Sequence, residues 1–175
     1  MARLLKAVAW GVAVLIGLLL LAVGIGFLLP AEHTASAERV VAGSPESVWA
    51  VITDIEGMPH WRPGVISTER LSARDGLEVW RESGPTGSMT IQVTASESPE
   101  RLVTRIADQD LPFGGTWTYE LRPAAEGHRT RITLIEDGEI YNPFFRFVAR
   151  FILGYEGTME AYLDGLETRM EERGG

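Results

Sequence analysis

Few side chains in this 175-residue sequence are spaced for metal or acid–base chemistry. The three histidines, His33, His60 and His128, form no HxH or HExxH pattern, and they fall on a predicted strand, a turn and a hairpin loop. A metal centre requires several ligands to converge, so we predict none. His60 lies beside Trp61 and is the best single candidate for proton transfer, although a surface turn histidine is the simpler interpretation.

Motifs for nucleophilic catalysis and phosphate binding are also missing from the sequence. The absence of cysteine excludes disulfides, thiol nucleophiles and thiolate metal sites. There is no GxSxG elbow, and Gly114-Gly115 precedes a predicted strand, whereas a phosphate-binding loop opens a helix. Glu82 alternates with Trp80, so it shares the face of that strand, where a buried carboxylate could act as a general acid. We predict no catalytic residue and no cofactor.

The clearest pattern is a set of apolar and aromatic side chains at predicted inward positions. Rings that carry a hydroxyl or an indole N–H suit an apolar ligand with one polar group. Ordinary core packing is the alternative for most of these residues. Arg81 and Arg105 could anchor a carboxylate ligand, although a solvated sheet edge is the simpler explanation. The candidate cavity-lining residues are Trp61, Trp80, Met89, Ile91, Trp117, Tyr119, Phe144, Phe147, Phe151, Tyr155 and Met159.

Seven segments with the pattern of strands would carry many of these residues. Trp117, Tyr119 and Leu121 would share one face of a strand while Thr116 and Thr118 take the other, as in an antiparallel sheet with one face covered. The predicted strands are residues 33–41, 65–71, 77–83, 88–95, 101–107, 116–121 and 130–140. The predicted turns contain Asp75-Gly76, Gly84-Pro85, Ser98-Pro99, Gly114-Gly115 and Glu126-Gly127.

Helix signals occur between the first two strands and after the last. Ser44-Pro45 is a strong helix start, with serine at the N-cap and proline at the first helical position. From Asn142-Pro143 to Met170, apolar residues recur at three- and four-residue spacing, which predicts one long amphipathic helix. Gly154 and Gly157 interrupt it and would permit a bend or a close approach. Asp137-Gly138 predicts a bulge or bend in the last strand.

Several segments resemble the START/Bet v 1-like superfamily (SRPBCC). Residues 44–49 (SPESVW), Asp54 and residues 58–61 (MPHW) are similar to its strand-to-helix entry and the following turn. Residues 111–117 and 142–162 resemble its bacterial polyketide cyclase/dehydrase-like members. The resemblance covers residues 33–173 and implies an α+β helix-grip fold, in which a seven-stranded antiparallel curved sheet surrounds a long C-terminal helix. It implies a cavity more than a particular reaction.

Residues 7–29 form an uncharged run that would be a helix of roughly 34 Å, enough to cross a bilayer. A cleaved signal peptide is the alternative, because Ala35-Ser36-Ala37 is a passable cleavage site. The run is longer than a signal core, which favours retention. We therefore expect an anchor over residues 1–30 and one domain over 31–175. Arg3 and Lys6 precede the run, which predicts a cytoplasmic N-terminus and an extracytoplasmic domain on a bacterial cell membrane.

All 24 acidic residues follow Pro30, and Arg3 and Lys6 are the only basic residues before it, so the domain has a formal charge of −10. No basic patch is visible, which argues against nucleic acid as a partner. We expect a membrane-anchored domain that binds a hydrophobic small molecule or lipid between sheet and helix. The alternatives are a polyketide cyclase/dehydratase-like enzyme and a non-catalytic structural or interaction protein. Ligand identity and oligomeric state remain open.

Overall fold

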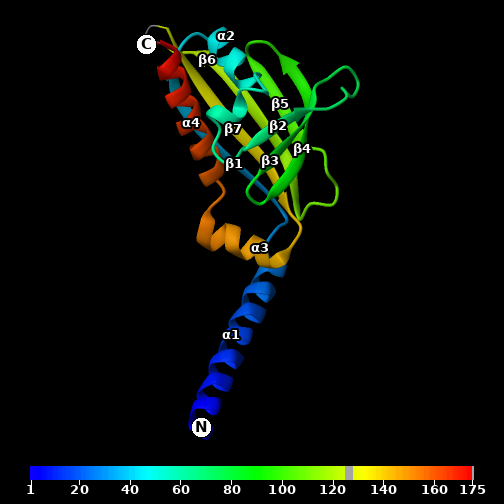
Figure 1. The fold of residues 1–175 in the computed structure, drawn as a ribbon, viewed down its shortest axis with the longest axis vertical. Helices are drawn as coiled ribbons and strands as arrows, with labels where there is room; N and C mark the ends of the chain where they lie inside the picture. The colour runs from blue at the N-terminus through cyan, green and yellow to red at the C-terminus, as the bar shows by residue number, and fades with distance from the viewer. Residues whose placement is uncertain (125–127, 175) are drawn as a thin grey trace.

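The computed structural model describes residues 1–124 and 128–174, and the predicted Glu126-Gly127 turn lies outside them. An α+β domain sits on one end of a long N-terminal helix, α1 (Ala2–Leu28) (Figure 1). From Arg3 to Leu28 this helix is long and apolar enough to cross a membrane, a test that a signal sequence would also pass. Only three residues separate α1 from the first strand, so the domain lies close to the end of the helix.

The domain is built on one seven-stranded antiparallel sheet in the order β1-β7-β6-β5-β4-β3-β2. Every predicted strand is present, and the predicted helix-grip fold is confirmed. The alternation read from the sequence also holds, because Tyr119 and Leu121 are buried on the inner face. The strands are β1 (Glu32–Ala42), β2 (Ser67–Arg70), β3 (Val79–Gly84), β4 (Gly87–Glu97), β5 (Arg101–Ile106), β6 (Phe113–Pro123) and β7 (Arg129–Ile140).

Two short helices connect β1 to β2. Helix α2 (Pro45–Ile52) begins where the sequence predicts, with the Ser44 hydroxyl accepting a hydrogen bond from the Ser47 backbone N–H. Its Val48, Val51 and Ile52 are buried in the core. The 3₁₀ turn η1 (Met58–His60) follows and leads into a loop that begins at Trp61.

The predicted single C-terminal helix is divided into two parts. Helix α3 (Pro143–Val148) continues as a π-helical turn, η2 (Ala149–Leu153). The helix is then interrupted at residues 154–156, before α4 (Gly157–Gly174) begins. Gly154 has φ +74°, a backbone conformation that other residues rarely adopt. The expected continuous helix is therefore wrong: residues 143–153 and α4 run in different directions (Figure 1).

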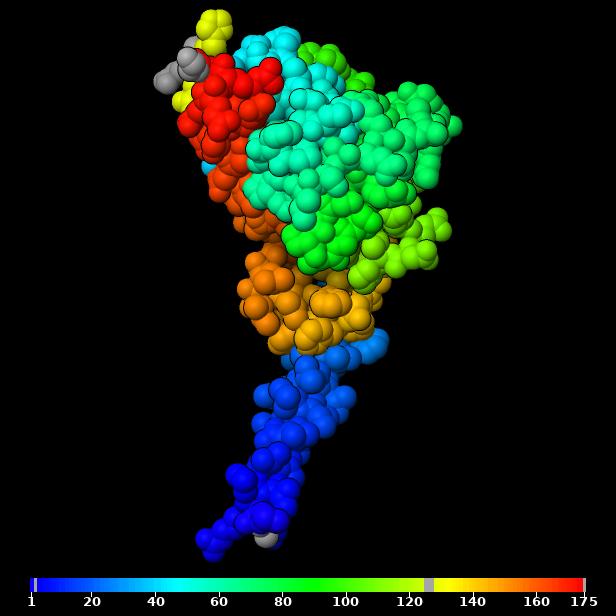
Figure 2. Space-filling view, viewed as in Figure 1, coloured from blue at the N-terminus to red at the C-terminus, as the bar shows by residue number. Residues whose placement is uncertain are grey.

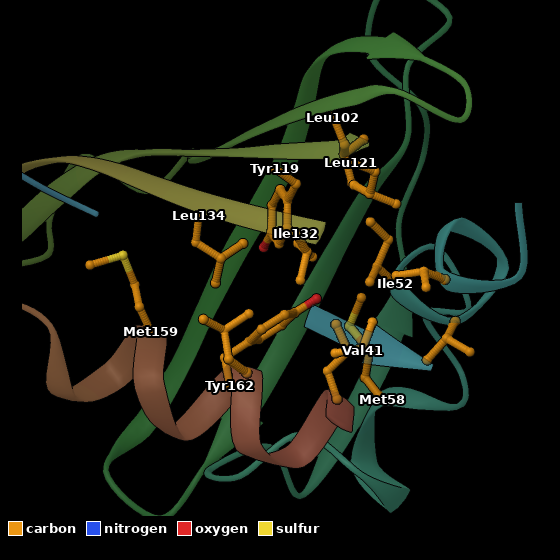
Figure 3. Close-up of a cluster of buried hydrophobic side chains, with 14 of the residues drawn as sticks. Val41, Ile52, Met58, Leu102, Tyr119, Leu121, Ile132, Leu134, Met159 and Tyr162 are labelled. Carbon is orange, nitrogen blue, oxygen red and sulfur yellow. The ribbon is translucent and has the colours of Figure 1, made fainter. Parts of the chain in front are cut away.

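Of the two C-terminal helices, only α4 covers the inner face of the sheet, where it shares the core with α2. Its fully buried Met159, Leu163 and Leu166 meet Ile132 and Leu134 of β7. The close-up shows Tyr162 of α4 and Tyr119 of β6 on facing sides of this core (Figure 3). Burial of such side chains, each worth about 1.5–3 kcal/mol, holds helix and sheet together.

One arginine on β1 fastens α4 to the sheet edge. The Arg39 guanidinium donates hydrogen bonds of 2.7–2.8 Å to Glu160, Asp164 and Glu167 on successive turns of α4. Three acceptors at this spacing lie along one face of a helix. The arrangement fixes the rotation of α4, and with it the residues that face the sheet.

The predicted bulge at Asp137-Gly138 is wrong. The pairing of β7 with β1 and with β6 is unbroken through both residues, and the register shift lies instead in β4, between Val93 and Ala95. Gly138 has a packing reason, because an added Cβ would lie 2.4 Å from the His33 ring. The absence of a side chain at Gly138 therefore leaves room for that imidazole.

Candidate ligand-binding site

A buried ion pair lies between the sheet and the loop after η1. The Arg62 guanidinium donates to the Glu82 carboxylate at 2.5 Å, and Glu82 is only 3% exposed. The Trp80 indole N–H donates to the same carboxylate oxygen at 2.9 Å. Burial opposes the charge on Arg62, but the adjacent Glu82 carboxylate holds the pKa of Arg62 above its ordinary value. Arg62 is therefore a cation held inside an apolar core, with the Glu82 carboxylate as its partner.

Two glycines allow the loop that carries Arg62 to reach this position. A Cβ on Gly165 of α4 would lie 2.4 Å from the Trp61 carbonyl oxygen. A Cβ on Gly84 of β3 would lie equally close, at 2.4 Å, to the carbonyl oxygen of Gly64. The loop is thus packed between helix and sheet, and its arginine points inward.

Aromatic rings surround the Arg62 guanidinium. Its central carbon lies 5.3 Å from the centre of the Tyr162 ring and 5.8 Å from that of Trp117, within the range of cation–π attraction. Tyr162 also packs edge-on against Trp61, with ring centres 5.1 Å apart, and against Tyr119 at 5.7 Å. We call Arg62, Glu82, Trp80, Trp117, Tyr119, Tyr162 and Trp61 the polar-aromatic cluster.

Two polar atoms of this cluster have no hydrogen-bond partner among the described residues. They are Glu82 Oε2 and the Tyr162 hydroxyl, and both are buried. Burial raises the pKa of Tyr162 well above its ordinary value, and it also raises the pKa of Tyr119. Because an unpaired buried polar group destabilises a fold by about 1–3 kcal/mol, two of them in one cluster need a physical explanation.

A second polar group faces inward nearer to the α3–α4 break. The His33 ring stacks on Tyr155 with centres 4.0 Å apart, and its Nε2 lies 3.7 Å from a Glu136 carboxylate oxygen. Burial lowers the pKa of His33. Burial raises the pKa of Glu136, and a hydrogen bond from Trp117 partly opposes that effect. Since Trp117 also belongs to the polar-aromatic cluster, polar side chains run continuously from Tyr155 to Glu82.

A pocket of about 470 Å³ opens beside Tyr155, where β1 meets the break between η2 and α4. This volume lies within the range of small-molecule sites. Its lining residues are Thr34, Ala35, Arg150, Leu153, Gly154, Tyr155, Glu156 and Gly157. A second pocket, of about 300 Å³, lies between the β5–β6 loop and Tyr141.

The structure brings most of the predicted lining residues together but not all of them. Seven belong to the core or pack directly against it: Trp61, Trp80, Met89, Ile91, Trp117, Tyr119 and Met159. Tyr155 lines the larger pocket. Phe144, Phe147 and Phe151 lie on α3 and η2, away from the inner face of α4, and Phe151 is 60% exposed. Their separation follows from the break at Gly154.

Of the charged and titratable residues considered from the sequence, only some lie in the site. Glu82 shares the buried face of Trp80, as expected. Arg81 and Arg105 are exposed, as is His60 on its turn. Arg62 was not predicted as a site residue, because Arg62-Pro63-Gly64 is typical of a helix stop. Its only signal is the neighbouring Trp61. Among the described residues, no group of three or more His, Asp or Glu side chains could hold a metal ion.

Comparison with known proteins supports the fold and the family. The family model described as polyketide cyclase / dehydrase and lipid transport matches residues 32–171. No protein with a curated description matches the chain. The structure resembles a START superfamily protein from Mycobacterium smegmatis, with 20% identity, a TM-score of 0.65, and coverage of 80% of this chain and 98% of the other.

Two structures of named enzymes are similarly close in fold. The Zhui aromatase/cyclase from Streptomyces sp. R1128 has a TM-score of 0.68 at 15% identity, covering 82% of this chain and 96% of its own. Norcoclaurine synthase from Thalictrum flavum, in complex with dopamine and hydroxybenzaldehyde, has a TM-score of 0.63 at 16% identity, covering 85% and 91%. At these identities the likeness concerns the fold alone.

Proposed function

The chain belongs to the polyketide cyclase / dehydrase and lipid transport family, and we propose that it binds a hydrophobic small molecule or lipid beside the membrane. Residues 31–175 form the binding domain and residues 1–30 the anchor. The ligand has an apolar body and one hydrogen-bonding group, which lies in the polar-aromatic cluster. The domain shields or presents this ligand and does not transform it.

The observation that carries this proposal is the pair of unpartnered atoms, Glu82 Oε2 and the Tyr162 hydroxyl. The carboxylate oxygen accepts hydrogen bonds only, whereas the hydroxyl can donate or accept. A ligand hydroxyl can donate to Glu82 or accept from Tyr162, and either bond would offset the penalty of burying these atoms. A ligand carboxylate would instead meet the Glu82 charge, so we favour an alcohol over an acid.

The pocket beside Tyr155 supplies the entrance. It is the larger of the two described pockets. Its wall includes Gly154, which has a positive φ, and Gly157, the first residue of α4. From there, Tyr155, His33 and Glu136 lead towards Trp117 and the polar-aromatic cluster. An amphiphile entering head-first would follow polar groups inward and leave its apolar tail against Met159 and the pocket wall.

Membrane anchoring by α1 is part of the proposal. Residues of α1 are apolar and mostly exposed, as a lipid-facing helix requires. The alternative cleavage triplet Ala35-Ser36-Ala37 lies inside β1, where Ala37 is buried and pairs with Leu134. Cleavage there would remove half of an edge strand, which favours retention of the anchor. The basic residues before the span favour a cytoplasmic N-terminus.

A cyclase- or dehydratase-type enzyme is the second candidate. The same two groups favour it, because a buried carboxylate and a tyrosine with a raised pKa could exchange protons with a substrate. This reading requires Glu82 or Tyr162 to touch reacting atoms. If the protein turns over a polyketide substrate and both Glu82→Gln and Tyr162→Phe retain that activity, this catalytic role of the two residues is ruled out.

Native mass spectrometry of the full-length chain released from lipid nanodiscs tests the binding proposal. We expect one amphiphile per chain that survives release of the bulk lipid. Gly157→Trp places a large side chain in the pocket entrance, where a Cβ meets nothing within 4 Å, and should abolish the adduct. Gly174→Trp is the matched control, because it adds the same ring to open space at the other end of α4. Equal occupancy in both variants, or no adduct in any preparation, would refute the proposal.

A further inference from the structure

The segment formed by α3 and η2 exposes a strongly apolar surface. Tyr141, Phe145, Phe151, Ile152 and Leu153 are each between 49% and 71% exposed, and we call these five residues the α3–η2 surface. Contiguous apolar side chains of this size rarely face water on a soluble domain. The space-filling view shows this part of the chain, coloured orange, forming the base of the domain directly above α1 (Figure 2).

The same segment packs against the apolar end of α1. A Cβ on Gly26 would lie 1.8 Å from the Pro143 carbonyl oxygen, so the two helices touch through backbone. Ala22, one turn earlier in α1, is also buried. The Arg146 guanidinium donates to the Leu29 carbonyl oxygen at 3.5 Å, close to the end of α1. Because Ala22 and Gly26 lie within the uncharged run, α3 lies at the level of its last two turns.

The charge of this segment differs from that of the rest of the domain. Between Tyr141 and Leu153 the sequence contains Arg146 and Arg150 and no acidic residue, in a domain whose formal charge is −10. A helix that combines exposed large apolar residues with arginines is typical of segments that lie in the plane of a membrane interface. Arg150 is exposed, and beside anionic headgroups it would add electrostatic attraction.

We propose that the α3–η2 surface inserts into the interfacial layer of the same bilayer that α1 spans. This inference rests on the membrane anchoring in the proposed function. The occupant is lipid, because the segment that carries these exposed side chains begins at Pro143, in contact with Gly26 of the apolar, exposed helix α1. Arg150 and Leu153 also line the larger pocket, so insertion places the pocket entrance at the lipid, where an amphiphile could enter without crossing water.

Spin labelling tests this placement in the full-length chain, which contains no native cysteine. Ile152→Cys carries a nitroxide on the α3–η2 surface. Ile66→Cys is the matched control, because both isoleucines are 66% exposed and Ile66 lies next to the edge strand β2. Leu18→Cys reports on the middle of α1. The labelled chains are placed in nanodiscs of phosphatidylcholine and phosphatidylglycerol, and collision with oxygen is compared with collision with a water-soluble nickel chelate.

We expect the Ile152 and Leu18 labels to collide with oxygen and not with nickel, and the Ile66 label to collide readily with nickel. If Leu18 is in lipid but Ile152 is as open to nickel as Ile66, the inserted surface is refuted and the anchor stands. If Leu18 is also open to nickel, both the anchor and the insertion are refuted. Shielding of Ile152 from both reagents, with spin–spin broadening, would assign the surface to a second copy of the chain and would also refute insertion.

Discussion

The polar-aromatic cluster and the α3–η2 surface are both rich in aromatic residues. The sequence predicts one helix that contributes residues to both regions. Their surroundings differ completely. Tyr162 of α4 is buried against a charged pair, whereas Phe151 of η2 is 60% exposed. The rings of the cluster carry N–H or O–H groups, while four of the five side chains on the α3–η2 surface carry no polar atom. In our two proposals this difference corresponds to separate partners: a ligand with a polar group for the cluster, and lipid for the surface.

Gly154 makes this division possible. Its positive φ ends the π-helical turn and lets α4 start in a new direction, so that α3 packs against α1 and α4 packs against the sheet. An uninterrupted helix would have to present Phe151 and Met159 to similar surroundings. The break therefore converts one apolar pattern into two surfaces.

The largest expected difference between the two regions is in stability. Glu82→Gln removes the partner of the buried Arg62 charge and should lower the free energy of unfolding by about 3–5 kcal/mol. Phe151→Ser on the α3–η2 surface should change the free energy of unfolding of the domain by only about 0.5 kcal/mol, because the side chain packs little against protein. Urea denaturation of the full-length chain in nanodiscs, followed by tryptophan fluorescence, measures both.

Two further variants test whether burial of the Arg62–Glu82 pair causes the loss of stability expected for Glu82→Gln. Glu69→Gln breaks the exposed Arg81–Glu69 pair, whose atoms are 3.0 Å apart, and should change stability by at most about 1 kcal/mol. Replacing both partners, with Arg62→Met and Glu82→Met, should recover most of the loss, since no unpaired charge is then buried. A loss at Glu82→Gln no larger than at Glu69→Gln would show that the two regions do not differ in this way.

A smaller effect is expected where the two regions meet, at His33. Burial lowers the pKa of His33 from 6.5, so the unfolded chain takes up a proton at a higher pH than the folded one. Stability should therefore fall as the pH drops through 6.5 towards the lower folded value. Urea denaturation at about pH 7.5 and about pH 5.5 measures this effect. The free energy of unfolding should be lower at the lower pH by roughly 1 kcal/mol or less, and this difference should be smaller in His33→Gln.

The sequence predicted the sheet well because each strand obeys a local rule. Tyr119 and Leu121 alternate with polar residues, and Ser44 caps α2 through its own side chain, so neighbouring residues carried the information. The Gly154 break was predicted only as a bend. Periodicity extends across it without change, and only the packing of Pro143 on Gly26 and of α4 on the sheet separates the two helices.

The candidate site was harder to predict because its central contact is long-range. Glu82 could be placed on the face of Trp80 by alternation, but nothing local links it to Arg62, 20 residues earlier. That contact depends on Gly165 and Gly84, which admit the loop from two distant elements. Sequence patterns place residues on faces of single elements, whereas a site such as this one is made by the packing of several.

Competition between two matched ligands tests the central claim most directly. Dodecanol and its methyl ether are mixed in equal amounts into the nanodisc lipid, so both reach the full-length chain from the same phase, and native mass spectrometry resolves the two complexes. If the polar-aromatic cluster holds a ligand hydroxyl, the alcohol complex should exceed the ether complex by about tenfold, because only the alcohol can donate to Glu82 Oε2. Equal amounts of the two complexes would contradict the account.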